Sequence, residues 1–195
     1  IITGTRSTNL SESGIIIISN ASNILFTSNI IFNTEGANGY QSSCIIFNDP
    51  ESSASFFGNV MSARSYSIGY IESSQVMGNN NIFMDGGVDN SANSAIWMNN
   101  IFNGYCSSIP EENNNICSVD MDSVFVDPGS YDFHLLPGSP ARGNGINGED
   151  IGIYGGEPPY IDGGFPSLPA VIDLNSDIIV DPQNGLNIEF KVKGN

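Results

Sequence analysis

A short pattern that recurs along the first half of the chain constrains its fold more than any other feature. Each copy places an asparagine between bulky apolar residues, and four segments align on it: ILFTSNIIF with Asn29, ASFFGNVM with Asn59, QVMGNNNIF with Asn80 and SAIWMNNIF with Asn100. The asparagines are 59 − 29 = 30, 80 − 59 = 21 and 100 − 80 = 20 residues apart. Such irregular spacing is typical of stacked units that differ in the lengths of their loops.

The length of the repeat predicts the shape of each unit. A β-strand rises about 3.3 Å per residue, so roughly twenty residues complete one circuit of a flattened cylinder with three short strands and three turns. Successive circuits would stack about 4.8 Å apart and bring equivalent residues above one another. We expect two inward ladders of side chains, the first of Phe26, Phe56, Met77 and Trp97 and the second of Ile31, Met61, Ile82 and Phe102.

The four asparagines are expected at one turn of each circuit. Asparagine tolerates the left-handed backbone conformation, and its amide can bond to the asparagine of the next circuit. The sequence therefore predicts an all-β fold, a short right-handed parallel β-helix. The alternative is an antiparallel sandwich whose strands end in asparagine, but no two-residue Asn-Gly or Asp-Gly hairpin separates these strands.

Charge and composition narrow the possible partners. The 195 residues include 5 Lys and Arg against 21 Asp and Glu, a formal net charge of −16. This negative field repels phosphate backbones, so we expect no nucleic-acid partner. It also disfavours anionic membranes and polyuronate chains unless calcium bridges them, and no apolar run is long enough to predict membrane insertion.

The segment from residue 124 to residue 155 differs in texture from the repeats. Phe133, Leu135 and Leu136 predict a strand end, the run from Pro137 to Pro140 predicts a compact turn, and the segment from Asp150 to Gly155 predicts a short strand flanked by glycine.

This segment resembles the C-terminal closing segment of secreted bacterial right-handed parallel β-helix proteins, the pectin-lyase-like superfamily, especially those of Bacteroidetes-type bacteria. The matching runs are Phe125-Val126-Asp127-Pro128, Asp132-Phe133-His134-Leu135, Pro137 to Ala141 and Asp150 to Gly155. The run from Arg142 to Gly145 departs from the pattern, because an apolar residue, an Asp and a small residue commonly follow the alanine there. The resemblance implies a secreted or cell-surface protein in which this segment closes the helix and carries no chemistry; His134 is expected to be a turn or strand residue.

The three cysteines allow one disulfide. Cys106 and Cys117 bracket the polar segment CSSIPEENNNIC, whose length suits a loop closed by a disulfide, whereas Cys44 has no obvious partner. Three unrelated thiols are the alternative.

The chain is expected to have three parts: β-helix circuits and the closing segment in residues 1–157, a linker in 158–169, and two strands in 170–195. The strands follow from the alternation in residues 170–174 and 186–192, with a turn at 182–185 between them. They would pack on the helix or be attached to it as a separate module.

Candidate catalytic and metal-binding residues follow from the chemistry used on this fold. Polysaccharide lyases need a base near a uronate, often with calcium, and Arg64 and Tyr66 would share one face of a strand. Asp85 and Asp89 could supply oxygen ligands for calcium from a loop. Inverting hydrolases use clustered acids, and the pair of this kind would be Asp120 and Asp122 on one strand face.

Each candidate also has a structural explanation, which we favour. Arg64 can pair with a nearby acid. The run DGGVDN, which contains Asp85 and Asp89, is typical of a turn. Asp120 and Asp122 are typical of a solvated acidic rim. The leading functional expectation is therefore a non-catalytic extracellular or cell-surface module that serves as a scaffold, an adhesin or a carbohydrate-contacting surface, with a polysaccharide or a cell-surface protein as partner.

Two alternatives stay open. The chain could be the C-terminal part of a calcium-dependent polysaccharide lyase or glycoside hydrolase whose catalytic circuits lie upstream. It could also assemble end to end into a filament, if the first circuit at Ile1 to Thr3 presents an uncovered strand edge.

Overall fold

The chain forms two compact units, Ile1–Tyr160 and Ile161–Asn195, each described here by itself. The computed structural model describes residues 2–3, 12–33, 41–64, 66–69, 75–89, 95–104, 106, 109, 113–156, 159–162, 170–176 and 188–193. These residues form strands, turns and short 3₁₀ segments, and none of them lies in an α-helix.

Three parallel sheets make up most of the first unit. The five-stranded sheet has the spatial order β1 (Ile2–Thr3), β4 (Ile30–Asn33), β7 (Val60–Ala63), β10 (Ile82–Asp85) and β12 (Ile101–Phe102). The four-stranded sheet has the order β11 (Ile96–Met98), β9 (Val76–Asn79), β6 (Ala54–Phe57) and β3 (Ile24–Thr27). The three-stranded sheet has the order β2 (Glu12–Ile18), β5 (Gln41–Phe47) and β8 (Tyr66–Gly69).

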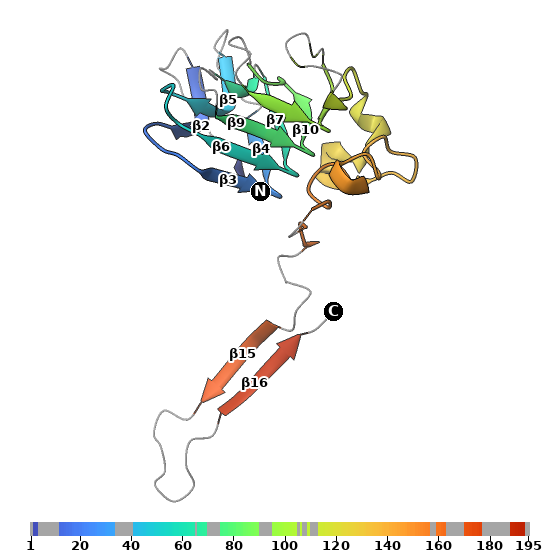
Figure 1. Ribbon diagram of the computed structural model, residues 1–195. Helices are drawn as coiled ribbons and strands as arrows, with labels where there is room; N and C mark the ends of the chain where they lie inside the picture. Colours follow the sequence, from blue (N-terminus) through green and yellow to red (C-terminus); the bar gives the residue numbers. More distant parts are fainter. Residues whose placement is uncertain are drawn as a thin grey trace, which may run out of the picture. The chain divides into compact units, whose positions relative to one another are not determined.

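The chain visits the three sheets in a fixed rotation. It passes through β2, β3 and β4, then β5, β6 and β7, and then β8, β9 and β10. Each strand pairs in parallel with its equivalent in the next circuit, and Figure 1 shows the strands in layers from blue through green. This arrangement is consistent with a parallel β-helix, and its parallel pairing contradicts the antiparallel sandwich.

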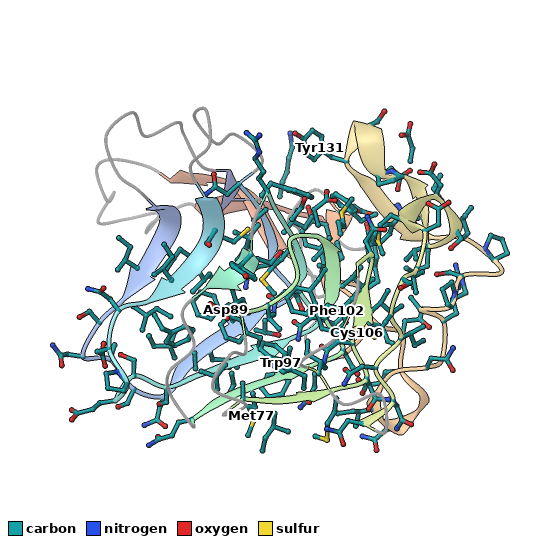
Figure 2. The ribbon with its side chains drawn as sticks, turned by 90° about the horizontal axis from the view of Figure 1, so that it is seen from above. Met77, Asp89, Trp97, Phe102, Cys106 and Tyr131 are labelled. Atoms are coloured by element: carbon teal, nitrogen blue, oxygen red, sulfur yellow. A yellow bond between two sulfur atoms is a disulfide. The ribbon has the colours of Figure 1, made fainter. Side chains whose placement is uncertain are left out.

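The first interior ladder contains a glycine where a methionine was predicted. The pairing runs Phe26 to Phe56, Phe56 to Gly78 and Gly78 to Trp97. Met77 instead pairs with Ser55 and Ile96, points outward and is 41% exposed. Figure 2 shows Met77 at the outer edge of the molecule and Trp97 farther in.

The second interior ladder is shifted by one residue at the same circuit. Phe83, not Ile82, pairs with Met61 and Phe102, and the rings of Phe83 and Phe102 stack with centroids 4.6 Å apart. Ile82 pairs with Val60 and belongs to the opposite face of the sheet.

Both errors have one cause, the run of asparagines from residue 79 to residue 81. Alignment on Asn80 places the neighbouring side chains on the wrong faces, because a shift of one residue along a strand reverses inside and outside. The equivalent of Asn59 is Asn81, 22 residues later, and the next step to Asn100 is 19 residues.

The asparagine ladder, defined as Asn29, Asn59, Asn81, Asn100 and Asn115, joins successive circuits. The Oδ1 of Asn81 accepts from the backbone N–H of Asn59 at 3.0 Å and from its Nδ2 at 2.9 Å. The Nδ2 of Asn81 donates to the carbonyl of Phe56 in the preceding circuit at 2.9 Å. The step from Asn100 to Asn115 has the same pattern, so Asn115 belongs to the ladder although it was not predicted.

The left-handed backbone conformation belongs to the residue before each ladder asparagine. Positive φ occurs at Ser28, Gly58, Asn80, Asn99 and Asn114, with values between 50° and 60°. The sequence predicted one asparagine that both adopts the left-handed conformation and bonds to the next circuit. In the structure two adjacent residues do this: the residue before the ladder asparagine has the positive φ, and the ladder asparagine bonds to the neighbouring circuits. Asn80 is a turn residue and not a ladder residue.

The five-stranded sheet is buried on both faces. Its inner face carries Ile31, Met61 and Phe102 in one core, and its outer face carries Val60 and Ile101 in a second core. The second core is completed by the closing segment through buried side chains of Val124, Phe125, Phe133, Leu135, Ile151 and Ile153. The closing segment thus covers the side of the stack along this sheet.

The closing segment holds its shape through turns that its acids stabilise. It contains η2 (Met121–Ser123), β13 (Phe125–Asp127), η3 (Pro128–Ser130), β14 (Asp132–Leu135) and η4 (Ile146–Gly148), with β13 and β14 antiparallel. The carboxylates of Asp127, Asp132 and Asp150 each accept a backbone N–H from the same segment, that of Ser130, His134 and Gly143 respectively. Arg142, where the sequence departs from the family pattern, donates to the carbonyls of Leu135 and Leu136.

In the second unit, β15 (Ala170–Ser176) pairs antiparallel with β16 (Ile188–Lys193). The predicted turn at residues 182–185 and most of the predicted linker, residues 158 and 163–169, lie outside the described residues. Whether these strands pack on the first unit stays a prediction.

The register can be tested with one substitution at two adjacent positions. Asn81→Gly removes an acceptor from two donors of Asn59 and a donor from the Phe56 carbonyl, so we expect a loss of about 3 kcal/mol or more in the free energy of unfolding. Asn80→Gly keeps a residue suited to positive φ and should cost about 1 kcal/mol. Urea unfolding measures both, and equal losses would contradict the register.

Gly78 offers a second test of interior packing. A Cβ there would lie 2.0 Å from the Trp97 ring, so Gly78→Ala should destabilise the protein by about 1–3 kcal/mol through overpacking. Gly104→Ala is the control, because no atom lies within 4 Å of a Cβ at that position. Thermal unfolding should separate the two variants, and a Gly78→Ala protein as stable as the control would refute the placement of Trp97.

Candidate functional site

The structure separates Arg64 and Tyr66. Arg64 is exposed in the turn that follows β7, whereas Tyr66 is half-buried and opens β8. The expectation that both share the face of one strand is wrong, because Arg64 lies outside both strands.

Asp85 and Asp89, the two residues predicted as calcium ligands, also lie in different surroundings. Asp85 is the exposed last residue of β10, and its carboxylate accepts from the hydroxyl of Ser62 at 3.1 Å. Asp89 is half-buried, and its backbone N–H donates to the carbonyl of Ile68. In the part of the chain that the structure describes, no three His, Cys, Asp or Glu side chains gather as metal ligands.

Asp120 and Asp122 lie at a 3₁₀ turn and not on a strand. Asp120 is the N-cap of η2 and accepts from the backbone N–H of Asp122 at 3.0 Å. Both side chains are exposed, which agrees with a structural role in the turn.

His134 is an exposed residue of β14, in the strand position that the sequence predicted. Its Nδ1 lies 2.7 Å from Oδ1 of Asp132, and its ring stacks on Tyr154 with centroids 4.6 Å apart. The backbone N–H of His134, and then its side chain, lower the pKa of Asp132. Asp49 is another turn acid, and the hydroxyl of Ser52 is the largest cause of its lowered pKa.

The cysteines divide into one disulfide and one buried thiol. Cys106 and Cys117 are bonded, with their Cα atoms 5.8 Å apart, so the predicted pairing is confirmed. Cys44 is fully buried and its Sγ donates to the carbonyls of Ile31 and Ser62. Burial raises the pKa of the Cys44 thiol to about 12, so the reactive thiolate is strongly disfavoured at neutral pH.

None of these residues forms a convergent site, but the outer face of the four-stranded sheet has an unusual surface. This face carries one row of Leu25, Ser55, Met77 and Ile96 and a second row of Thr27, Phe57, Asn79 and Met98. Leu25 is 60% exposed and Ile96 is 51% exposed, and Met77 and Met98 are also exposed. Contiguous apolar side chains on an outer sheet face are characteristic of contact surfaces.

A pocket of about 370 Å³ lies at one end of this face. Leu25, Thr27 and Phe57 form its sheet side, and Ile146 and Glu149 of the closing segment form the opposite side. The closing segment is held there by bonds to Asn80: its Oδ1 accepts from the N–H of Ile146 at 2.9 Å, and its carbonyl accepts from the N–H of Gly152 at 2.8 Å. The turn residue misassigned to the ladder therefore builds the pocket.

Gly58 lets the two sides approach closely. A Cβ at Gly58 would lie 3.0 Å from the carbonyl oxygen of Gly152, so a side chain there would push the closing segment away. The same glycine supplies the positive φ of its turn.

Asn79 is the polar group that distinguishes this pocket. It lines the pocket and is 8% exposed, and its Oδ1 has no hydrogen-bond partner in the part of the chain that the structure describes. A buried polar atom without a partner costs about 1–3 kcal/mol, so such atoms are rare in folded proteins and often mark sites that a ligand completes.

The pocket was not predicted from the sequence. Its two sides come from segments far apart in the sequence: Asn80 and Ile146, which are hydrogen-bonded, are 66 residues apart, and Leu25 is farther still from Ile146. The only signal was the alternation of apolar residues in the second strand of each repeat, which the misalignment at residues 79–81 obscured.

Comparison with family models, with curated proteins and with solved structures finds no match for this chain. In the described residues, no helix has the length and apolar character needed to cross a membrane.

The disulfide should contribute measurably to stability. It closes a loop across a sequence separation of 11, for which chain-entropy arguments give about 3 kcal/mol. The double variant Cys106→Ser with Cys117→Ser should lose about that amount in urea unfolding, and a reducing agent should lower the stability of the wild type equally. Cys44→Ala provides the comparison, since its unfolding midpoint should still fall on reduction. A wild type unaffected by reduction would contradict the bond.

Proposed function

We propose that the first unit is a right-handed parallel β-helix of the pectin-lyase-like kind. The observation that supports it most is the fixed rotation through three parallel sheets, with an asparagine ladder at one turn. The motif-level likeness of residues 125–155 to the closing segment of that superfamily agrees with this proposal.

We further propose that the unit works outside the cell or on its surface as a carbohydrate-contacting module without catalysis. The outer face of the four-stranded sheet and its adjoining pocket carry this proposal. Apolar side chains such as Leu25, Met77 and Phe57 can cover the C–H face of a sugar ring, while polar groups at the pocket bond to hydroxyls. The disulfide supports an oxidising compartment.

The absence of convergent chemistry on this face is the reason for proposing binding. In the described structure Arg64 follows β7, Tyr66 opens β8, and Asp120 and Asp122 share the turn at η2, where Asp120 caps the turn. General acid and base catalysis requires such groups within hydrogen-bond reach of one reacting bond.

The contact face can be tested with two variants of matched exposure. Leu25→Ser removes an apolar side chain that is 60% exposed on the proposed face, and Ile17→Ser removes one that is 60% exposed on the three-stranded sheet. Loss of one apolar contact is worth about 1–2 kcal/mol, so we expect Leu25→Ser to weaken glycan binding about tenfold. Ile17→Ser should bind as the wild type does. Binding is measured on a panel of neutral and uronate oligosaccharides by calorimetry.

The same panel tests for catalysis. We expect no unsaturated or reducing products after prolonged incubation with the full chain. Product formation that Arg64→Ala abolishes would contradict the non-catalytic proposal, and equal weakening by both Ser variants would contradict the assignment of the face.

A further inference from the structure

The pocket beside the four-stranded sheet offers hydrogen-bond acceptors and no positive charge. Oδ1 of Asn79 has no partner among the described residues, and Glu149 contributes a half-buried carboxylate. Thr27 adds a hydroxyl that can donate or accept. No Lys, Arg or His is among the residues that line the described pocket.

This set of groups selects the charge of a ligand. A ligand that satisfies Asn79 must bring a donor, and a hydroxyl is the neutral donor of suitable size. An anionic ligand would face the carboxylate of Glu149, and like charges a few ångströms apart repel each other. The pocket therefore disfavours uronates and sugar phosphates.

The volume of the pocket and its apolar wall favour a ligand of a particular shape. The volume of about 370 Å³ is near the lower end of the range for small-molecule sites, about 300–1,000 Å³. Leu25, Phe57 and Ile146 supply apolar contact. A ring with one C–H face and several hydroxyls fits both the wall and the acceptors.

We propose that the pocket binds one neutral hexopyranose ring of an uncharged glycan, with the rest of the glycan lying along the outer face of the four-stranded sheet. Oδ1 of Asn79 is covered in the free protein, so the Asn79 side chain turns on binding and its Oδ1 then accepts from a ring hydroxyl. The inference rests on the proposed carbohydrate-contacting function and adds to it the site, the charge class of the sugar and the residues that select it.

Because Oδ1 of Asn79 is buried without a partner among the described residues, replacing Asn79 should not lower the stability of the free protein. Asn79→Leu replaces the amide by an apolar group of similar shape, so it removes a buried unsatisfied atom from the free protein. The variant should unfold at the same urea concentration as the wild type or a higher one, while it loses at least tenfold in affinity for neutral oligosaccharides. A residue with only a structural role would lose stability instead.

Glu149→Gln tests the selection by charge. Glutamine keeps the size of the side chain and can still accept from the amide of Asn80, whose Nδ2 lies 3.5 Å from Oε2 of Glu149. Its affinity for neutral hexose tetrasaccharides should stay within about twofold of the wild type. Tetragalacturonate, which should bind the wild type at least tenfold more weakly than the neutral tetrasaccharides, should gain affinity by about tenfold.

The experiment is calorimetric titration of the full chain and its variants with neutral hexose tetrasaccharides and with tetragalacturonate. Asn103→Ala, which removes an exposed amide that does not line the pocket, is the control and should bind as the wild type does. Tight binding of tetragalacturonate to the wild type would overturn the charge selection. Neutral binding that Asn79→Leu leaves unchanged would overturn the pocket, and the contact face would still stand if Ile96→Ser, on that face but outside the pocket, weakened the binding. Absence of all glycan binding would overturn the proposed function together with this inference.

Discussion

The amide-to-amide contact between stacked asparagines is the interaction on which the rest of the first unit depends. Each buried ladder side chain accepts two hydrogen bonds from the asparagine of one neighbouring circuit and donates to a carbonyl of that circuit. Asn59, Asn81 and Asn100 are completely buried, so these bonds satisfy polar groups that water cannot reach. A hydrophobic residue at the same turn would leave several backbone groups unpaired.

The ladder fixes the register of everything beside it. The strands on either side of the turn leave with defined inside and outside faces, which aligns Phe26 with Phe56 and Phe83 with Phe102 in the interior. The same register turns Leu25, Met77 and Ile96 outward. Both the aromatic core and the proposed contact face therefore follow from one repeated pair of residues.

Sequence patterns were sufficient for the fold class and for three circuits, because an asparagine between apolar strands is informative when it stands alone, as at Asn29 and Asn59. They failed at residues 79–81, where three adjacent asparagines fit the pattern equally. The positive φ of Asn80 and the hydrogen bonds of Asn81 to Asn59 and Asn100 separate the turn residue from the ladder residue in the structure. The fifth member, Asn115, was missed because its circuit is shorter, with 15 residues after Asn100. The pocket was unpredictable for another reason: it forms where the closing segment crosses the turns of Gly58 and Asn80, and no local pattern reports such a contact.

Amide hydrogen exchange measured by NMR tests the central claim most directly. If the ladder is formed, the backbone amides of Asn59, Asn81 and Asn100, which donate to side-chain oxygens at turns, should exchange only through global unfolding. Their protection should then match that of the amides of Val60 and Ile82, which donate to the carbonyls of Asn29 and Asn59 in the preceding circuits. Exchange of the three asparagine amides at the rate of an open turn, with the amides of Val60 and Ile82 still protected, would contradict the account.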